Sequence, residues 1–331
     1  MDTLYGYDYQ KHEPHIVTIG GGTGMPTLVR GLRQYTQNIT TIVTVADDGG
    51  SSGRLRRELG VLPPGDFRNN IAALSRDEAL MTQILQYRFG SAVGVNGHRE
   101  LQGHAFGNLL LAALTGITGS FHEALLAAGK ILAMQGRVLP STLEQVTLFA
   151  EVIVEGEGET AVTERIFGES AIPKAKRPIE RVGLLPETIR AYPPALQAIF
   201  QADLIVLGPG SLYTSILPNL LIPDLAEALQ CARAPKIYVC NIATQPGETD
   251  NYTTADHVET ILRHVSTDCL DIVVTNDNLS IPPDTGGEQT NYVTPILPDN
   301  IQTVTADLVD EMHPWRHDCK KLAEVIMGLL S

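Results

Sequence analysis

The sequence of 331 residues is poor in the features that mark several classes of protein. Its four cysteines show no C-x-x-C spacing, which argues against a zinc knuckle and against a dithiol redox pair. No stretch approaches the ~20 consecutive apolar residues of a membrane-spanning helix, and the first 15 residues contain no apolar run of the signal-peptide type. We therefore expect a cytoplasmic protein that does not insert into a membrane.

Positive charge is scarce as well. The chain has 24 Lys and Arg against 38 Asp and Glu, so its formal net charge is -14 and phosphate backbones are repelled at long range. This predicts that nucleic acid is not a partner. Residues 46–76 are a local exception with five arginines, and an anionic ligand is expected near them, whereas the acidic residues of 266–312 are interpreted as a solvated face.

The hydrophobic content of 43% is arranged as short β-branched runs that end in Gly-rich turns and precede segments of helical period. This pattern predicts an α/β fold, Rossmann-like, with a mainly parallel sheet and helices on both faces. The predicted strands are 15–19, 40–45, 204–207, 236–240 and 271–274. The predicted helices are 69–87, 107–114, 121–134, 223–231, 254–265 and 316–330.

The pattern changes between residues 148 and 194, where short β-type runs are broken by Gly and Pro. We interpret 148–194 as a small inserted β-rich lobe, 15–147 with 195–331 as a nucleotide-binding α/β domain, and 1–14 as an N-terminal tail. Ligands of such sheets bind beyond the carboxyl ends of the strands. Four polar loops, at 20–24, 46–53, 208–215 and 242–251, are therefore expected on one rim.

Two of these loops are rich in glycine and follow apolar strands, so their backbone amides can approach a phosphate closely. Neither completes the G-x-G-x-x-G fingerprint or a Walker A loop, and a tight strand-to-helix turn is the alternative interpretation. Together they suit a diphosphate, or a phosphate and a sugar. The candidate ligand-binding residues are Gly21, Gly22, Thr23 and Gly24 in the first loop, and Gly208, Gly210, Ser211 and Thr214 in the second.

Asp47 and Asp48 follow the second predicted strand, and two adjacent carboxylates can hold one magnesium ion beside phosphate oxygens. The alternatives are a ribose contact, as in an NAD-type dinucleotide site, and a cap of the helix beginning near Ser52. The same stretch matches G-x-S-x-G, but a hydrolase elbow is disfavoured because two carboxylates separate the strand end from the serine.

Further polar side chains gather near these carboxylates in the sequence. A Pro-Pro-Gly turn at 63–65 presents an acid, a guanidinium and two amides before a helix, and GHAFGN at 103–108 adds an imidazole and an amide. His104 and Asp66 are the rim residues that could act as a base, and Tyr252 offers an aromatic face in the fourth loop. The binding candidates from these segments are Arg54, Asp66, Arg68, Asn69 and Asn108, with a solvated helix face as the alternative for Arg54.

The motifs GGGTG, TVADDGGSSGRLR, PPGDFRNN, GHAFGNLLLAAL, LGPGSLYTSILPNLL, NIATQPGETDNYTTADHV and the RHD of residues 316–318 resemble the bacterial gluconeogenesis factor (YvcK-like) family. That family is similar in fold to 2-phospho-L-lactate transferase, a magnesium-dependent enzyme. The resemblance implies a regulatory protein that binds nucleotide sugars such as UDP-N-acetylglucosamine and supports cell-wall synthesis and cell shape on gluconeogenic carbon sources. It also implies that Thr23 faces the diphosphate and that Tyr292 and Arg316 contact the nucleotide sugar. Cys319 stands where relatives can carry a phosphorylatable Thr.

Two functions of different classes follow from these observations. A binding protein needs the phosphate loops and a pocket for base and sugar, whereas a transferase of a phosphate-linked group also needs magnesium and an acceptor pocket. A nicotinamide-dependent oxidoreductase is a weaker third option. The expected partners are a nucleotide sugar, cell-wall synthesis proteins and further copies of the chain, because a homo-oligomer is expected; no catalytic residue is assigned.

Overall fold

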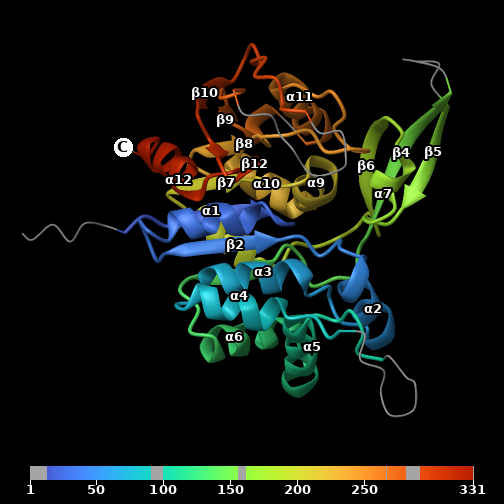
Figure 1. Cartoon of the computed structure of the whole chain (residues 1–331). Coiled ribbons are helices and arrows are strands. Elements are labelled where there is room, and N and C mark those ends of the chain that lie inside the picture. The colour runs from blue at the N-terminus through green and yellow to red at the C-terminus, as the bar shows by residue number, and fades with distance from the viewer. Residues whose placement is uncertain (1–12, 91–99, 156–161, 266, 281–290, 331) are drawn as a thin grey trace, which may run out of the picture.

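A computed structural model describes residues 13–90, 100–155, 162–265, 267–280 and 291–330. Its centre is a seven-stranded sheet of order β10-β9-β8-β7-β1-β2-β3, in which every neighbouring pair is parallel (Figure 1). This confirms the predicted Rossmann-like α/β fold. The strands are β1 (Ile16–Gly20), β2 (Ile39–Val43), β3 (Arg137–Pro140), β7 (Leu204–Leu207), β8 (Lys236–Val239), β9 (Ile272–Asn276) and β10 (Gln302–Ala306).

The inner strands are short apolar runs because both of their faces are covered. Every residue of β1, β2, β7, β8 and β9 is buried, as expected for parallel strands packed between two helix layers. β1 pairs with β2 on one side and with β7 on the other, so that Ile16 lies opposite both Ile39 and Leu204. β1 is therefore an inner strand of the sheet, hydrogen-bonded on both sides.

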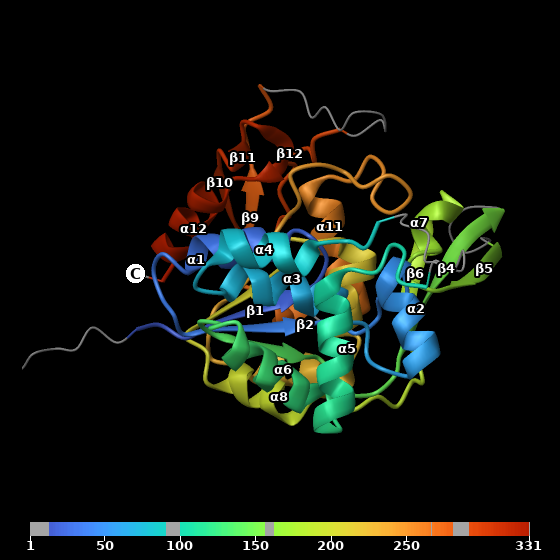
Figure 2. The same ribbon diagram turned by 60° about the horizontal axis from the view of Figure 1, so that its bottom comes forward.

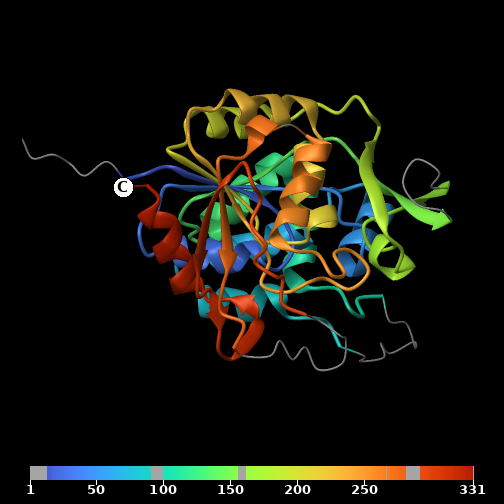
Figure 3. The same cartoon turned by 90° about the horizontal axis from the view of Figure 1, so that it is seen from above.

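Helices cover both faces of the sheet. α1 packs against α3 and α12, whereas α10 packs against α8, and Figure 3 shows the two groups on opposite sides. The helices before the lobe are α1 (Met25–Leu32), α2 (Gly50–Leu59), α3 (Gly65–Leu74), α4 (Glu78–Gln86), α5 (Phe106–Thr118) and α6 (Phe121–Ile131). Those after the lobe are α8 (Pro193–Phe200), α9 (Leu217–Leu220), α10 (Pro223–Cys231), α11 (Thr254–His264) and α12 (Cys319–Gly328), with a π-helical turn η2 (Leu212–Ile216) and a 3-10 turn η3 (Thr267–Cys269).

The strand order reverses between β1 and β7. The chain leaves β1 through α1 toward β2, and it leaves β7 through α9 and α10 toward β8, in the opposite direction across the sheet. Right-handed crossovers then place these helices on opposite faces and open a crevice between the loops that follow β1 and β7. The two Gly-rich loops are those loops, so the fold brings them together.

A three-stranded antiparallel sheet of order β5-β4-β6 stands at one end of the main body, beside α2 (Figures 1 and 2). It consists of β4 (Thr147–Glu155), β5 (Val162–Phe167) and β6 (Ile179–Leu185), with the short helix α7 (Ile172–Ala175). We call it the lobe; the predicted boundaries at residues 148 and 194 stay a prediction. A separate hairpin of β11 (Val309–Asp310) and β12 (His313–His317) precedes α12.

Two of the predicted helices were wrong in extent. The segment 69–87 forms two helices, because the Ser75 hydroxyl bonds back to the Ile71 carbonyl at the end of α3 and the Asp77 carboxylate caps the first turn of α4. The closing helix begins at Cys319 rather than at Arg316, since the Asp318 carboxylate accepts the amides of residues 320 and 321. Arg316 therefore lies on a strand. β3, β6, β10, α8 and the β11–β12 hairpin were not predicted.

In the described ranges, no single helix has both the length and the hydropathy needed to cross a membrane. The bent pair of α5 and α6 meets these two conditions only when its members are taken together.

Candidate functional site

A cavity of about 530 Å³ lies beside the Gly-rich loops that follow β1 and β7. Three of the four predicted rim loops and the β11–β12 hairpin line it. The predicted residues that it brings together are Gly22, Thr23, Gly24, Gly210, Ser211 and Arg316; the unpredicted ones include Glu169, Asn241, Gln245, Glu248, Trp315 and His317.

The two Gly-rich loops touch each other. A side-chain carbon on Gly24 would lie 2.6 Å from the backbone oxygen of Pro209, so only glycine permits this approach. Gly22 has a φ of +69°, a left-handed conformation that glycine adopts without strain, and its amide donates to Asp66 Oδ2 at 2.7 Å. The first loop then enters α1, whose N-terminus adds a partial positive charge to this end of the cavity.

The donors of the second loop are engaged by a carboxylate from the fourth loop. Glu248, only 8% exposed, accepts the Ser211 hydroxyl at 3.3 Å and the Thr214 hydroxyl at 3.2 Å. The nearby backbone amides of Tyr213 and Thr214 favour its charged form and act to lower its pKa. Burial raises the pKa of Glu248 to about 7. A phosphate at this loop would therefore compete with an internal carboxylate, which the sequence analysis did not anticipate.

Amide side chains connect the second loop to the fourth. Gln245 Nε2 donates to the Ser211 hydroxyl at 2.7 Å, and its oxygen accepts Asn241 Nδ2 at 3.2 Å. Asn241 in turn exchanges hydrogen bonds with the backbone of Gly210, at 2.9 and 3.2 Å. This wall of the cavity is consequently rich in hydroxyl, amide and carboxylate groups.

Strand β12 also lines the cavity. Arg316 is exposed at the cavity, and the neighbouring His317 is buried, with Nε2–H donating to the carbonyl of Cys240 at 3.1 Å. Burial lowers the pKa of His317 to about 4, so its imidazole is neutral at physiological pH. Arg316 is the cationic side chain among the described residues that line this cavity.

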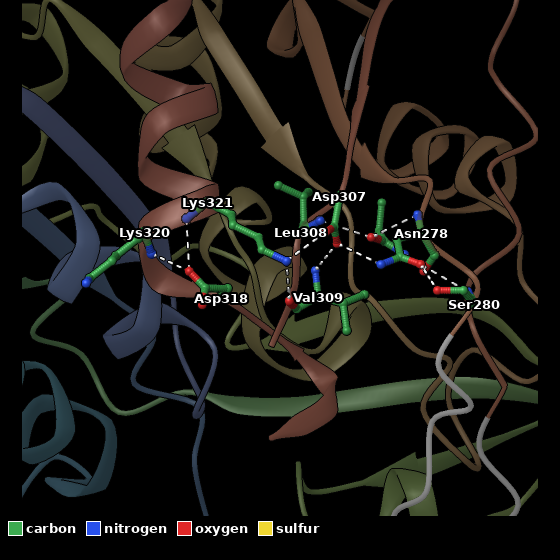
Figure 4. Close-up of polar contacts among 9 residues, drawn as sticks. Asn278, Ser280, Asp307, Leu308, Val309, Asp318, Lys320 and Lys321 are labelled. Carbon is green, nitrogen blue, oxygen red and sulfur yellow. Dashed lines mark hydrogen bonds and ion pairs between the residues drawn. The ribbon is translucent and has the colours of Figure 1, made fainter. Parts of the chain in front are cut away.

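A polar network holds the hairpin in place (Figure 4). The Asp307 carboxylate accepts Lys321 Nζ at 2.7 Å and Asn278 Nδ2 at 3.1 Å, and Lys321 also donates to the carbonyl of Val309 at 3.1 Å. The Asp318 carboxylate caps α12 immediately after the hairpin. The residues on either side of the hairpin are thus tied to one another and to α12, next to the strand that carries Arg316.

A smaller pocket of about 240 Å³ is lined by five of the other predicted residues: Asp47, Asp66, Arg68, Asn69 and Asn108. The Arg68 guanidinium donates to the Asn108 side chain at 3.0 Å and to that of Asn69 at 2.9 Å. Asp66 lines this pocket while bonding the Gly22 amide of the first loop. It therefore connects the two pockets.

The adjacent aspartates contact different partners. Asp47 Oδ1 accepts the amide of Gly49 at 2.8 Å and lines the smaller pocket, whereas Asp48 Oδ1 accepts the amide of Ser170 in the lobe at 2.9 Å. Within the described ranges, no group of three or more His, Cys, Asp or Glu is arranged to hold a metal ion. The donor chemistry of Asp47 and Asp66 suits magnesium, but Asp48 is occupied in attaching the lobe.

Carboxylates are concentrated where the two pockets meet. Glu169, which the lobe supplies between β5 and α7, has a pKa raised to about 8, first by burial and then by Asp47 and Asp66. Burial, and next the charge of Asp47, raise the pKa of Asp66 to about 6. Glu169 gave no signal in the sequence, because an isolated acid in a polar loop is the commonest kind of surface residue.

The remaining candidates lie outside both cavities. Arg54 donates to the carbonyl of Gln102, and Gly208 lies against the Val239 carbonyl behind the loop. Gly21 packs against the side chains of Asp66 and Thr44, and the hydroxyl of Thr214 donates to Glu248.

Two of the aromatic candidates are packed elsewhere. The Tyr292 hydroxyl is buried without a hydrogen-bond partner, so its contact with a nucleotide sugar stays a prediction. Tyr252 bonds the hydroxyl of Tyr213 at 2.7 Å and does not line the large cavity. It therefore does not offer its ring there.

His104 lies beside the smaller pocket. Its Nδ1 is 3.0 Å from the hydroxyl of Ser51, a residue that lines this pocket. Burial lowers the pKa of His104, and Asn108 Nδ2 donates to the same hydroxyl at 3.1 Å. The smaller pocket thus contains a hydroxyl bonded to an imidazole.

Comparison with known proteins gives consistent results. The family model described as 2-phospho-L-lactate transferase CofD matches residues 16–324. A putative gluconeogenesis factor of Thermoanaerobacterium thermosulfurigenes is 46% identical over 331 residues, 96% of this chain and 97% of that protein. The gluconeogenesis factor of Bacillus subtilis is 42% identical over 333 residues, 96% of this chain and 99% of that protein.

A putative gluconeogenesis factor of a Nostoc species is 53% identical over 261 residues, 79% of this chain, and the match spans about half of that longer protein, 54%. A crystal structure of a UPF0052 family member from Bacillus halodurans has a TM-score of 0.81 and 39% identity, covering 95% of this chain and 99% of that one. By extent and identity, the chain belongs to the gluconeogenesis factor family, within the wider family of 2-phospho-L-lactate transferase CofD.

Proposed function

We propose that this chain is a nucleotide-sugar-binding regulatory protein, with a ligand of the UDP-N-acetylglucosamine type. The observation that carries the proposal is the composition of the large cavity. Its lining offers loop amides, a helix N-terminus and Arg316, which suit a diphosphate, together with Asn241, Gln245 and Ser211, which suit hydroxyl groups. Its volume of about 530 Å³ lies within the range of small-molecule sites.

The cavity walls support binding rather than chemistry. The neutral His317 commits Nε2 to the Cys240 carbonyl, and Glu248 already accepts several donors of the second loop. His317 bonds no hydroxyl or thiol, and Glu248 is shared between the hydroxyls of Ser211 and Thr214, unlike a catalytic base that is directed at one serine. A role in cell-wall synthesis and cell shape on gluconeogenic carbon sources, exerted through protein partners and in a homo-oligomer, is part of the same proposal.

Isothermal titration with UDP-N-acetylglucosamine tests this function. We expect saturable binding to the wild type and a loss of about tenfold or more in Arg316→Ala, the scale of a charged hydrogen bond. The matched control is Arg233→Ala, a surface arginine after α10 and outside both cavities. Absence of binding to the wild type, or equal affinity in Arg316→Ala, would refute the proposal.

A magnesium-dependent transferase of a phosphate-linked group is the second candidate. The smaller pocket favours it, because Asp66 links this pocket to the phosphate loop and the Ser51 hydroxyl is bonded to His104 there. Such a pocket could receive an acceptor. Incubation with UDP-N-acetylglucosamine and magnesium, followed by separation of nucleotides, tests this: sustained release of UDP or UMP, with water as the acceptor of the transferred group, that Asp47→Ala abolishes would favour the transferase.

A further inference from the structure

Trp315 is the single tryptophan of the chain, and it lines the large cavity. Most residues around this cavity are glycines, small polar residues or amides, and the indole is the largest ring among the described residues that line it. The side chain is only partly buried. A partly exposed indole over a polar cavity has an apolar face that the folded chain does not use for its core.

Contacts of Trp315 and of the residues next to it hold this ring in position. The imidazole of His313 meets the indole edge-on, with ring centroids 5.5 Å apart and an interplanar angle of 88°. Two positions after Trp315, His317 donates to the Cys240 carbonyl, and the amide of Asp318 donates to the carbonyl of Leu308 at 2.8 Å. Together with the network of Figure 4, these contacts anchor the end of β12 that leads into α12. A ligand would therefore meet a preformed surface.

We propose that Trp315 is the platform on which the base of a bound nucleotide stacks, and that it determines specificity for a ligand with a base. The inference rests on the proposed function. The second and fourth loops supply the hydroxyl and amide groups that recognise a sugar, and Arg316, next to Trp315, supplies the planar guanidinium that recognises phosphate. A flat indole face does not supply the hydrogen bonds that recognise a sugar or a phosphate, but it can stack on the π-face of a base.

The arrangement also orients the ligand. The base lies on the β12 wall, the diphosphate spans Arg316 and the first loop, and the sugar points toward Asn241 and Gln245. The indole face contacts every base alike, so stacking favours nucleotides over inorganic diphosphate without choosing among bases.

Trp315 gives the experiment a built-in signal, because all tryptophan fluorescence of the chain comes from this one ring. The wild type is titrated with UDP-N-acetylglucosamine, UDP and inorganic pyrophosphate, by calorimetry and by fluorescence. Both nucleotides are expected to quench the emission, whereas pyrophosphate, which has no base, binds without quenching. Trp315→Ala should weaken both nucleotides about tenfold or more, and Trp315→Phe should restore most of the affinity.

Phe200→Ala is the matched control, since this ring is 59% exposed on α8 and lies outside both cavities. Unchanged affinity for pyrophosphate in Trp315→Ala shows that the first loop is intact. Nucleotide binding with unchanged fluorescence and full affinity in Trp315→Ala would overturn the platform and leave the proposed function standing. Equal losses for pyrophosphate and nucleotides would also overturn it, because the ring would then only support the hairpin. If the wild type binds no nucleotide, the platform and the proposed function both fail.

Discussion

Removal of the Glu248 carboxylate should destabilise the loop that follows β7. In Glu248→Ala, the hydroxyls of Ser211 and Thr214 lose their acceptor, and a buried unpaired donor costs roughly 1–3 kcal/mol. Ser211 lines the large cavity and can turn toward water, so the buried Thr214 hydroxyl dominates. We expect the free energy of unfolding to fall by about 1–3 kcal/mol, measured by urea denaturation.

Glu248→Gln keeps the size and shape of the side chain but removes its ability to ionise. Folding raises the pKa of Glu248 from 4.5 to about 7, so the folded wild type holds a proton there that the unfolded chain releases above pH 4.5. The stability from this group is therefore full below about pH 4.5 and is lost as pH rises through about 7. The glutamine variant has no such titration, so its deficit relative to the wild type should shrink between pH 5 and 8.

The exposed Glu259 on α11 provides the control, and Glu259→Gln should change stability by less than about 0.5 kcal/mol at every pH. Two results would show that the loop does not bind the carboxylate as described. One is a Glu248→Ala variant as stable as the wild type, and the other is a Glu248→Gln deficit that does not vary with pH.

Three further predictions, with four substitutions, concern the rest of the site. Gly22→Val forces a branched side chain into a φ of +69° and toward the Ser215 hydroxyl, 3.1 Å from the new carbon, so calorimetry on the folded variant should show nucleotide affinity reduced at least tenfold; unchanged affinity would remove the first loop from the phosphate site. Asp47→Asn should abolish any magnesium dependence of ligand affinity and Asp48→Asn should retain it, because only Asp47 lines a pocket; the reverse order would contradict the assignment. Glu169→Gln should reduce the loss of stability that the wild type shows as pH rises through about 8, since burial raises the pKa of Glu169 to that value; an identical slope in denaturation from pH 6 to 9 would refute its burial.

The sequence predicted the parts of the site that depend on local signals. The Gly-rich loops after β1 and β7 are encoded by a few adjacent residues, and strand order alone brings them together. Glu248 belonged to a loop that was correctly placed on the rim, yet nothing local shows that its carboxylate faces the second loop 34 to 37 residues away in sequence. Trp315 could have been found as the single tryptophan beside Arg316, but a helix was predicted to begin there.

The carboxylates around the phosphate loop would repel a bound phosphate, and this repulsion matters for both proposed functions. A phosphate held by Thr23 and Gly24 would lie next to Asp66, which bonds the preceding amide, and near Glu169. Two like charges about 4 Å apart repel by roughly 4 kcal/mol at an effective dielectric constant of 20, which equals about three orders of magnitude in affinity. Arg316 offsets part of this repulsion for a diphosphate, and a proton on Glu169 or a magnesium ion at Asp47 would offset the rest. Replacing the acids by amides would remove this repulsion. The effect of Asp47→Asn on the magnesium dependence of ligand affinity therefore bears on the binding protein and the transferase alike.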